Sequence, residues 1–188
     1  MYLFMNGKLF SFSAPSGCGK TTILNEILKI FPDFYFSISA TTRQKRNGEA
    51  HGKEYYFLTR DEFQKHLNND DFIEWDEHFG NLYGTLKSDI LKHRSAGKNI
   101  IFDLDVNGTI NLKKYDPNTI SIFISPPNIE TLKQRLIVRG TETEEDIKMR
   151  LRRAAEELEK SKTFDYIIIN DDLKKATEDT KNIILQNK

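Results

Sequence analysis

The sequence predicts an α/β fold in which a central parallel sheet is covered by helices on both faces. Short apolar runs alternate with longer segments of helical periodicity, which is the pattern of a parallel sheet with helical crossovers. Several of the runs are apolar throughout, as expected for strands buried on both faces. We expect five core strands, at Leu9–Ser13, Phe34–Ser39, Asn99–Leu104, Thr119–Ile124 and Tyr166–Ile169.

Length and composition narrow the class of protein. The 188 residues suffice for one domain with a sizeable core. Because 28 basic and 28 acidic residues balance, the protein is not expected to coat nucleic acid or an anionic membrane. One cysteine excludes an internal disulfide, and the four histidines lack metal-ligand spacing. No signal peptide is apparent, and no apolar run approaches the roughly 18 residues of a membrane helix. We therefore expect a cytoplasmic protein with no obligate protein partner.

Local signals place some helix ends. Thr59 with Glu62, and Thr141 with Glu144, fit the capping box that satisfies free N–H groups at a helix start. Gly97 is expected to end a helix that begins near Leu86. In the helix after Thr141, a stripe of apolar residues should face the core, namely Ile147, Leu151, Ala155 and Leu158.

Two segments interrupt the alternation of strands and helices. Residues 37–85 carry aromatic residues in short runs broken by glycine and charge, which indicates a small strand-containing insertion. Residues 133–155 are dense in charge and predict a helical lid. The core would then comprise residues of about 1–36, 86–132 and 156–188.

A glycine-rich loop follows the first strand and opens a helix expected at Thr22–Ile30, which is the context of a phosphate-binding loop (P-loop). Its glycines let several backbone N–H groups point at one anion, and the helix start adds its positive dipole end. Lys20 supplies a full charge, and the Thr21 hydroxyl suits a magnesium ion. The alternative is a chance glycine-rich turn. The residues expected here to bind a nucleoside triphosphate, which the family resemblance described below makes ATP, are Ala14, Pro15, Ser16, Gly17, Cys18, Gly19, Lys20, Thr21 and Thr22.

Two carboxylates end the third expected strand. Asp103 and Asp105 are two residues apart and should project from the same side. Acidic groups at this end of a strand beside a P-loop commonly lie near the metal, and Asp103 is the preferred candidate. For Asp105 the alternative is a helix N-cap.

The insertion contains a compact set of phosphate-type donors between Ser39 and Phe57. Arg43 and Arg46 are three residues apart, and Tyr55 can add an uncharged donor. Arginine forks suit two-point recognition of phosphate. Taken alone, such an arginine pair is more often a solvated face.

Taken together, these motifs closely resemble the guanylate kinase family. The matching pieces lie in family order from Ser11 to Asp172: SAPSGCGKTT, SISATTRQKRNGEAHGKEYYF, FIEWDEHFGNLYGT, IIFDLDVNG, RGTETEEDIKMRL and IIINDD. The P-loop pattern ordinarily begins with glycine, and Ala14 is a variant associated with bacterial members. Gln44 stands where the family often has proline.

The resemblance implies the three-layer fold of P-loop kinases, with one domain over residues 1–188. It implies transfer of the γ-phosphoryl group of ATP to GMP, with Mg²⁺, giving ADP and GDP for guanine nucleotide supply. We also expect dGMP to be accepted. A site that closes over both substrates would keep water from accepting the phosphoryl group.

The resemblance also implies roles for residues. The GMP phosphate would be held by Arg43, Arg46, Tyr55 and Tyr83, with Glu49 nearby, and the base by Ser39, Glu74, Gly84 and Thr85, with Asp103 or Asp105. Transfer would depend on Lys20, Arg46, Arg139 and Arg150, with Arg135 a weaker candidate. Asn170 and Asp171 resemble contacts to the adenine end of ATP, and the metal would be held by Thr21 and Asp103.

The assignment of a base reader also makes chemical sense. Guanine presents N1–H and its amino group as adjacent donors, and one carboxylate such as that of Glu74 can accept both. Adenine offers an acceptor at N1 and would leave the carboxylate unpaired.

Three alternatives stay open. A protein-binding module with this fold typically lacks the P-loop, which this chain keeps. A kinase for another phosphorylated acceptor, such as a ribose phosphate, would not need the set of Ser39, Glu74 and Thr85. Cys18 fits either a redox switch, since a helix start can lower a thiol pKa, or a tolerated small residue.

Overall fold

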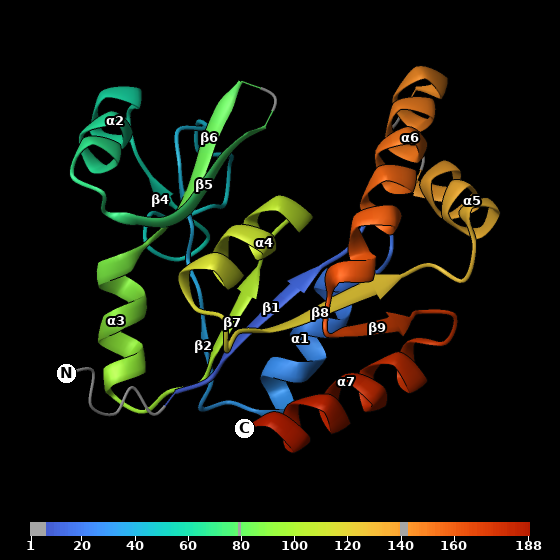
Figure 1. Cartoon of the computed structure of the whole chain (residues 1–188). Coiled ribbons are helices and arrows are strands. Elements are labelled where there is room, and N and C mark those ends of the chain that lie inside the picture. Colours follow the sequence, from blue (N-terminus) through green and yellow to red (C-terminus); the bar gives the residue numbers. More distant parts are fainter. Residues whose placement is uncertain (1–6, 79, 140–142) are drawn as a thin grey trace.

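The computed structural model describes residues 7–78, 80–139 and 143–188 as an α/β fold with a five-stranded parallel sheet (Figure 1). The strand order is β2-β7-β1-β8-β9, which confirms the predicted sheet. These strands are β1 (Leu9–Ser13), β2 (Tyr35–Phe36), β7 (Ile100–Asp103), β8 (Ile120–Ser125) and β9 (Tyr166–Ile169).

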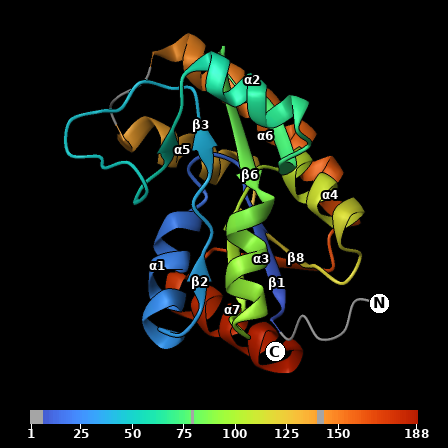
Figure 2. The same ribbon diagram turned by 90° about the vertical axis from the view of Figure 1, so that its left-hand side faces the viewer.

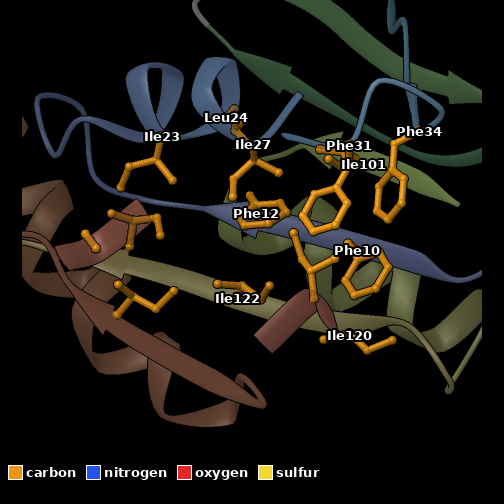
Figure 3. Close-up of a cluster of buried hydrophobic side chains, with 14 residues drawn as sticks. Phe10, Phe12, Ile23, Leu24, Ile27, Phe31, Phe34, Ile101, Ile120 and Ile122 are labelled. Atoms are coloured by element: carbon orange, nitrogen blue, oxygen red, sulfur yellow. The ribbon is translucent and has the colours of Figure 1, made fainter. Parts of the chain in front are cut away.

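Helices cover both faces of this sheet, because alternate strand residues point to opposite sides. Phe10 and Phe12 of β1 pack against Ile23 and Ile27 of α1, as Figure 3 shows. The other face carries α3 and α4. The helices are α1 (Lys20–Ile30), α3 (Lys87–Ser95), α4 (Val106–Tyr115), α5 (Ile129–Arg139), α6 (Glu144–Lys160) and α7 (Leu173–Asn187), and a 3₁₀ turn spans Ser161–Thr163.

A second, four-stranded sheet stands on the core in the order β4-β3-β6-β5. It lies within residues 37–86 and has its own buried cluster of Ala40, Phe63, Phe72 and Leu82. Its strand β5 lies against α4 of the core, and in Figure 2 the chain between β3 and β4 loops away from the rest of the molecule. The elements are β3 (Ala40–Thr41), β4 (Tyr56–Phe57), α2 (Arg60–Asn68), β5 (Phe72–His78) and β6 (Asn81–Leu86).

The expected strand Phe34–Ser39 is wrong in extent. The chain leaves the core sheet after Phe36 and enters the other sheet at Ala40. The apolar run does not show this change of sheet, because the residues of β2 in one sheet and of β3 in the other are close together in the sequence and have similar character.

Helix ends are predicted with mixed success. The Thr59–Glu62 capping box is present, and Gly97 ends α3 with φ 77°. The cap of α6 is Thr143 with Asp146, so the predicted pair with Glu144 is wrong; Thr141 lies outside the described residues. The sequence contains two overlapping patterns of threonine followed three residues later by an acidic residue, Thr141–Glu144 and Thr143–Asp146, and the second pair forms the cap.

The apolar stripe of α6 is also shifted by one residue from the prediction. Ala154 is buried and Ala155 is exposed. Ala154 belongs to a cluster with Leu132 and Leu136 of α5. The stripe therefore follows the spacing 147, 151, 154 and 158, because it packs along a neighbouring helix.

Within the described residues, no helix has the length and apolar character to cross a membrane.

Candidate active site

The P-loop runs from the end of β1 to the start of α1, as predicted. Gly17 and Gly19 have φ of 92° and 82°, a backbone region that side chains with a Cβ rarely adopt. The N–H of Cys18 donates to the Pro15 carbonyl over 3.2 Å. Helix α1 begins at Lys20, two residues before the predicted start, and directs its positive end at the loop.

Asn170 supports the P-loop from the end of β9. Its side-chain amide donates to the Cys18 carbonyl over 2.7 Å, and Asn170 is buried. A Cβ on Gly19 would lie 2.5 Å from this amide nitrogen, so this position requires glycine. The Arg135 guanidinium donates to the Asn170 carbonyl over 2.9 Å. Asn170 thus joins the P-loop to helix α5, whereas Asp171 beside it is exposed.

The Cys18 side chain is buried and packs under the helices α5 and α6. It is 1% exposed, in a cluster with Leu132, Leu136 and Ala154. This burial raises the pKa of the thiol to about 12, with smaller opposing effects from Arg135 and Lys20. The direction is opposite to that required by the redox-switch hypothesis and favours the interpretation of a tolerated small residue.

Lys20 and the two carboxylates after β7 have separate positions. The Lys20 ammonium lies 2.5 Å from a carboxylate oxygen of Asp103 and donates to the Leu104 carbonyl over 3.1 Å. Asp105 instead accepts from the Gly108 N–H over 2.7 Å as the N-cap of α4, so the N-cap alternative is confirmed.

A metal ion in this site would depend on nucleotide phosphates. Within the described ranges, no three His, Cys, Asp or Glu side chains gather at a distance suited to a metal. Thr21 is exposed in the first turn of α1, and Asp103 lies beside Lys20. A hard ion that takes one or two protein oxygens and completes its shell with phosphate and water fits these donors.

The arginines of the insertion differ in their surroundings. Arg43 makes a two-pronged ion pair with Glu49, with N···O distances of 2.8 and 3.1 Å, and both side chains are largely buried. Its guanidinium lies 5.3 Å from the centre of the Tyr55 ring. Arg46 is exposed on the loop after β3, and its backbone N–H donates to Glu49 over 2.8 Å.

One cavity of about 920 Å³ joins the P-loop to the insertion. Tyr55 and Tyr83, whose ring centres are 6.0 Å apart, line the cavity from the insertion. The rest of its lining comprises residues 14–22, Asp105, Val106, Asn107, Arg135, Arg153, Glu156, Glu157 and Lys160.

Glu74 and its partner Thr85, two of the predicted base readers, lie where the insertion meets α4. Glu74 is 7% exposed and accepts a hydrogen bond from the Thr85 hydroxyl over 2.5 Å. Burial raises the pKa of the Glu74 carboxyl to about 7, and the negative charges of Asp105 and Asp76 act in the same direction. Gly84 is packed against Phe72 and has no room for a Cβ. Ser39 is half-buried between β2 and β3.

The arginines predicted for transfer come from α5 and α6. Arg150 donates to the Ser16 hydroxyl over 2.5 Å, so the structure places it at the P-loop. Arg139 is the last residue of α5, and its side chain lies outside the described part.

Sequence reasoning missed a polar link at the base of α6. Lys160 donates to the Asn107 side-chain oxygen over 3.0 Å, and both residues line the cavity with the P-loop. The position of Asn107 two residues after Asp105 is the only sequence signal that pointed to it.

Comparison with known proteins gives a consistent result. The family model described as guanylate kinase matches residues 6–187. A guanylate kinase of Thermotoga maritima is 43% identical over 180 residues, which cover 96% of this chain and 87% of that protein. One of Bacteroides thetaiotaomicron is 46% identical, with 96% and 89% covered. The crystal structure of guanylate kinase from Anaplasma phagocytophilum aligns with a TM-score of 0.77 and 31% identity, over 96% of this chain and 85% of that one.

Proposed function

Because this chain belongs to the guanylate kinase family, we propose that it transfers the γ-phosphoryl group of ATP to GMP. A phosphate oxygen of GMP forms a bond to the γ-phosphorus of ATP. The bond from that phosphorus to the bridging oxygen breaks, and ADP and GDP are the products. The same proposal places the enzyme in guanine nucleotide supply in the cytoplasm.

The observation that carries this proposal is the cavity that joins the P-loop to Tyr55 and Tyr83. Phosphoryl transfer requires donor and acceptor phosphates in line, so one continuous space must reach both. The P-loop N–H groups would hold ATP. The tyrosine hydroxyls would donate to the phosphate of GMP, together with Arg43 and Arg46.

Guanine would be read by Glu74, Thr85 and Ser39. Thr85 already donates to one carboxylate oxygen of Glu74 and fixes its orientation. The guanine N1–H and amino group would donate to this carboxylate, and a good two-point contact of this kind contributes about 1 to 3 kcal/mol of discrimination. At this end of the site, Gly84 lets its backbone lie close to Phe72 and to the backbone of Glu74. Since these contacts involve base and phosphate, we also propose dGMP as an acceptor.

Lys20 and the arginines would neutralise charge on the moving phosphoryl group. Lys20 exchanges Asp103 for phosphate when ATP binds. Arg150 is already at Ser16 of the P-loop, and Arg139 would join it from α5. Residues 133–155 would act as a lid and residues 37–85 as the GMP-binding part, which close over the core formed by residues 1–36, 86–132 and 156–188. The adenine end of ATP would lie toward Asn170 and Asp171.

Magnesium is the proposed cofactor, with Thr21 as its protein ligand and Asp103 close to it. When bound, the ion would neutralise phosphate charge. This chain supplies the hydroxyl at the start of α1 and the surrounding N–H groups.

The test is an assay of ADP formation with ATP, magnesium and each nucleoside monophosphate in turn. We expect turnover with GMP and dGMP and little with AMP, CMP, UMP or dTMP. A Lys20→Ala variant should be folded and inactive, because the phosphate charge is then uncompensated. Turnover with a ribose phosphate and none with GMP would assign a different acceptor. A folded protein with no turnover on any acceptor would favour a binding module.

A further inference from the structure

The first turn of α4 lies directly beneath the Glu74 carboxylate. A Cβ placed on Gly108 would lie 3.2 Å from Oε2 of Glu74, 3.0 Å from Oδ1 of Asp105 and 3.3 Å from Cβ of Leu104. Contacts of 3.0 to 3.4 Å are tighter than nine in ten of those that real Cβ atoms make. Even the smallest side chain would therefore displace one of these groups by a few tenths of an ångström.

The Glu74 carboxylate is the group on which such a displacement would act. Asp105 is fixed by its hydrogen bond to the Gly108 N–H, and Leu104 belongs to the core. Glu74 comes from β5 of the insertion, where Thr85 holds the Oε1 oxygen and leaves Oε2 against α4. A glycine in this turn lets the helix and the carboxylate approach each other without an intervening methyl group.

A glycine inside a helix has an energetic cost. It raises the conformational entropy of the unfolded chain and lowers helix propensity relative to alanine. Gly108 has a negative φ, so its backbone does not require glycine, unlike Gly17 or Gly19. The close approach to Glu74 gives a reason for glycine here that folding of the helix alone does not provide.

We infer that Gly108 is a specificity-determining positioning residue, which keeps the Glu74 carboxylate at the place where it accepts the guanine donors. This inference rests on the proposed function. Gly108 acts through Glu74 and makes no contact with the reacting phosphates. Its replacement should therefore weaken GMP recognition and leave ATP binding and the transfer step intact.

The first test compares steady-state kinetics of Gly108→Ala with the wild type, and with Lys114→Ala as an exposed alanine control in the last turn of α4. We expect KM for GMP to rise about threefold to tenfold, because a misplacement of about 1 Å can cost about 100-fold and the displacement here is smaller. KM for ATP and kcat should stay within about twofold, and the melting temperature should be unchanged or higher. An unchanged KM for GMP would overturn the inference, as would a parallel loss of kcat, ATP affinity and melting temperature.

A double-mutant cycle shows whether the effect passes through Glu74. In a Glu74→Ala background the methyl group has no carboxylate to displace, so Gly108→Ala should add nothing to KM for GMP. The same fold-increase in both backgrounds would overturn the inference.

A measurement without nucleotide separates this inference from the proposed function. The pKa of the Glu74 carboxyl is followed by NMR titration in the wild type and in Gly108→Ala. The added methyl group desolvates the carboxylate and moves it from the helix start, so the pKa should rise. Absence of GMP turnover in the wild type would refute the proposed function alone, whereas an unchanged Glu74 pKa in the variant would refute the role of Gly108.

Discussion

The side-chain amide of Asn170 donates a hydrogen bond of 2.7 Å to the carbonyl of Cys18 and so ties the end of β9 to the P-loop. The two residues are 152 positions apart. Because Asn170 is buried and its amide nitrogen lies 2.5 Å from the place where a Cβ of Gly19 would be, the amide holds the loop in its observed shape.

Removal of this amide should loosen the ATP site. We expect Asn170→Ala to lower the free energy of unfolding by about 1 to 3 kcal/mol, because the buried Cys18 carbonyl loses its donor. KM for ATP should rise about tenfold as the loop becomes misplaced. Urea unfolding and steady-state kinetics measure the two effects. The exposed Asn182→Ala on α7 is the matched control, and equal behaviour of the two variants would contradict the prediction.

The raised pKa of Glu74 predicts a pH-dependent stability. The folded protein holds this proton more tightly than the unfolded chain, so this carboxyl lowers the free energy of unfolding as pH rises from 4.5 toward about 7. Glu74→Gln removes this ionisation. The free energy of unfolding of the variant, relative to that of the wild type, should therefore increase by about 2 to 3 kcal/mol when the pH is raised from 4 to 8.

Urea unfolding of both proteins at the two pH values measures this difference. Thr85 can still donate to the glutamine oxygen, which keeps the local hydrogen bond. A stability difference that stays constant between the two pH values would mean that Glu74 ionises normally.

Cys18 should be inert toward thiol reagents in the folded protein. The thiol is buried and its pKa is raised to about 12, so almost no thiolate is present at pH 8. An aromatic disulfide reagent should react slowly with the native protein and rapidly with protein unfolded in concentrated guanidinium chloride. Cys18→Ala should keep its activity after mild peroxide treatment, as should the wild type. Rapid stoichiometric labelling of the native protein would restore the redox hypothesis.

The ion pair of Arg43 with Glu49 predicts that a positive charge alone at position 43 does not suffice for tight binding of GMP. Arg43→Lys keeps the charge and loses the two-pronged geometry with Glu49. We expect KM for GMP to rise about tenfold while KM for ATP stays unchanged. Arg60→Lys, at an exposed arginine of α2, is the control. If both variants behave as the wild type, Arg43 is not part of the phosphate clamp.

Local patterns predicted much of this protein. The P-loop, the Thr59 cap and the presence of five core strands each depend on neighbouring residues, so the sequence shows them directly. The predicted cap of α6 is wrong because two overlapping residue pairs both fit the capping-box pattern. The expected strand at Phe34–Ser39 is too long, because an apolar run does not show where the chain passes from one sheet to the other.

By itself, the sequence determined the fold class, the phosphate-binding loop and the family resemblance, since each follows from residue types at short fixed spacings. Only the tertiary structure decided which distant groups meet: Asn170 with Cys18, Lys20 with Asp103, and Gly108 with Glu74. These contacts depend on sheet order and on how the insertion packs against α4. Burial then sets the pKa values of Cys18 and Glu74, because solvent exclusion belongs to the packed molecule as a whole.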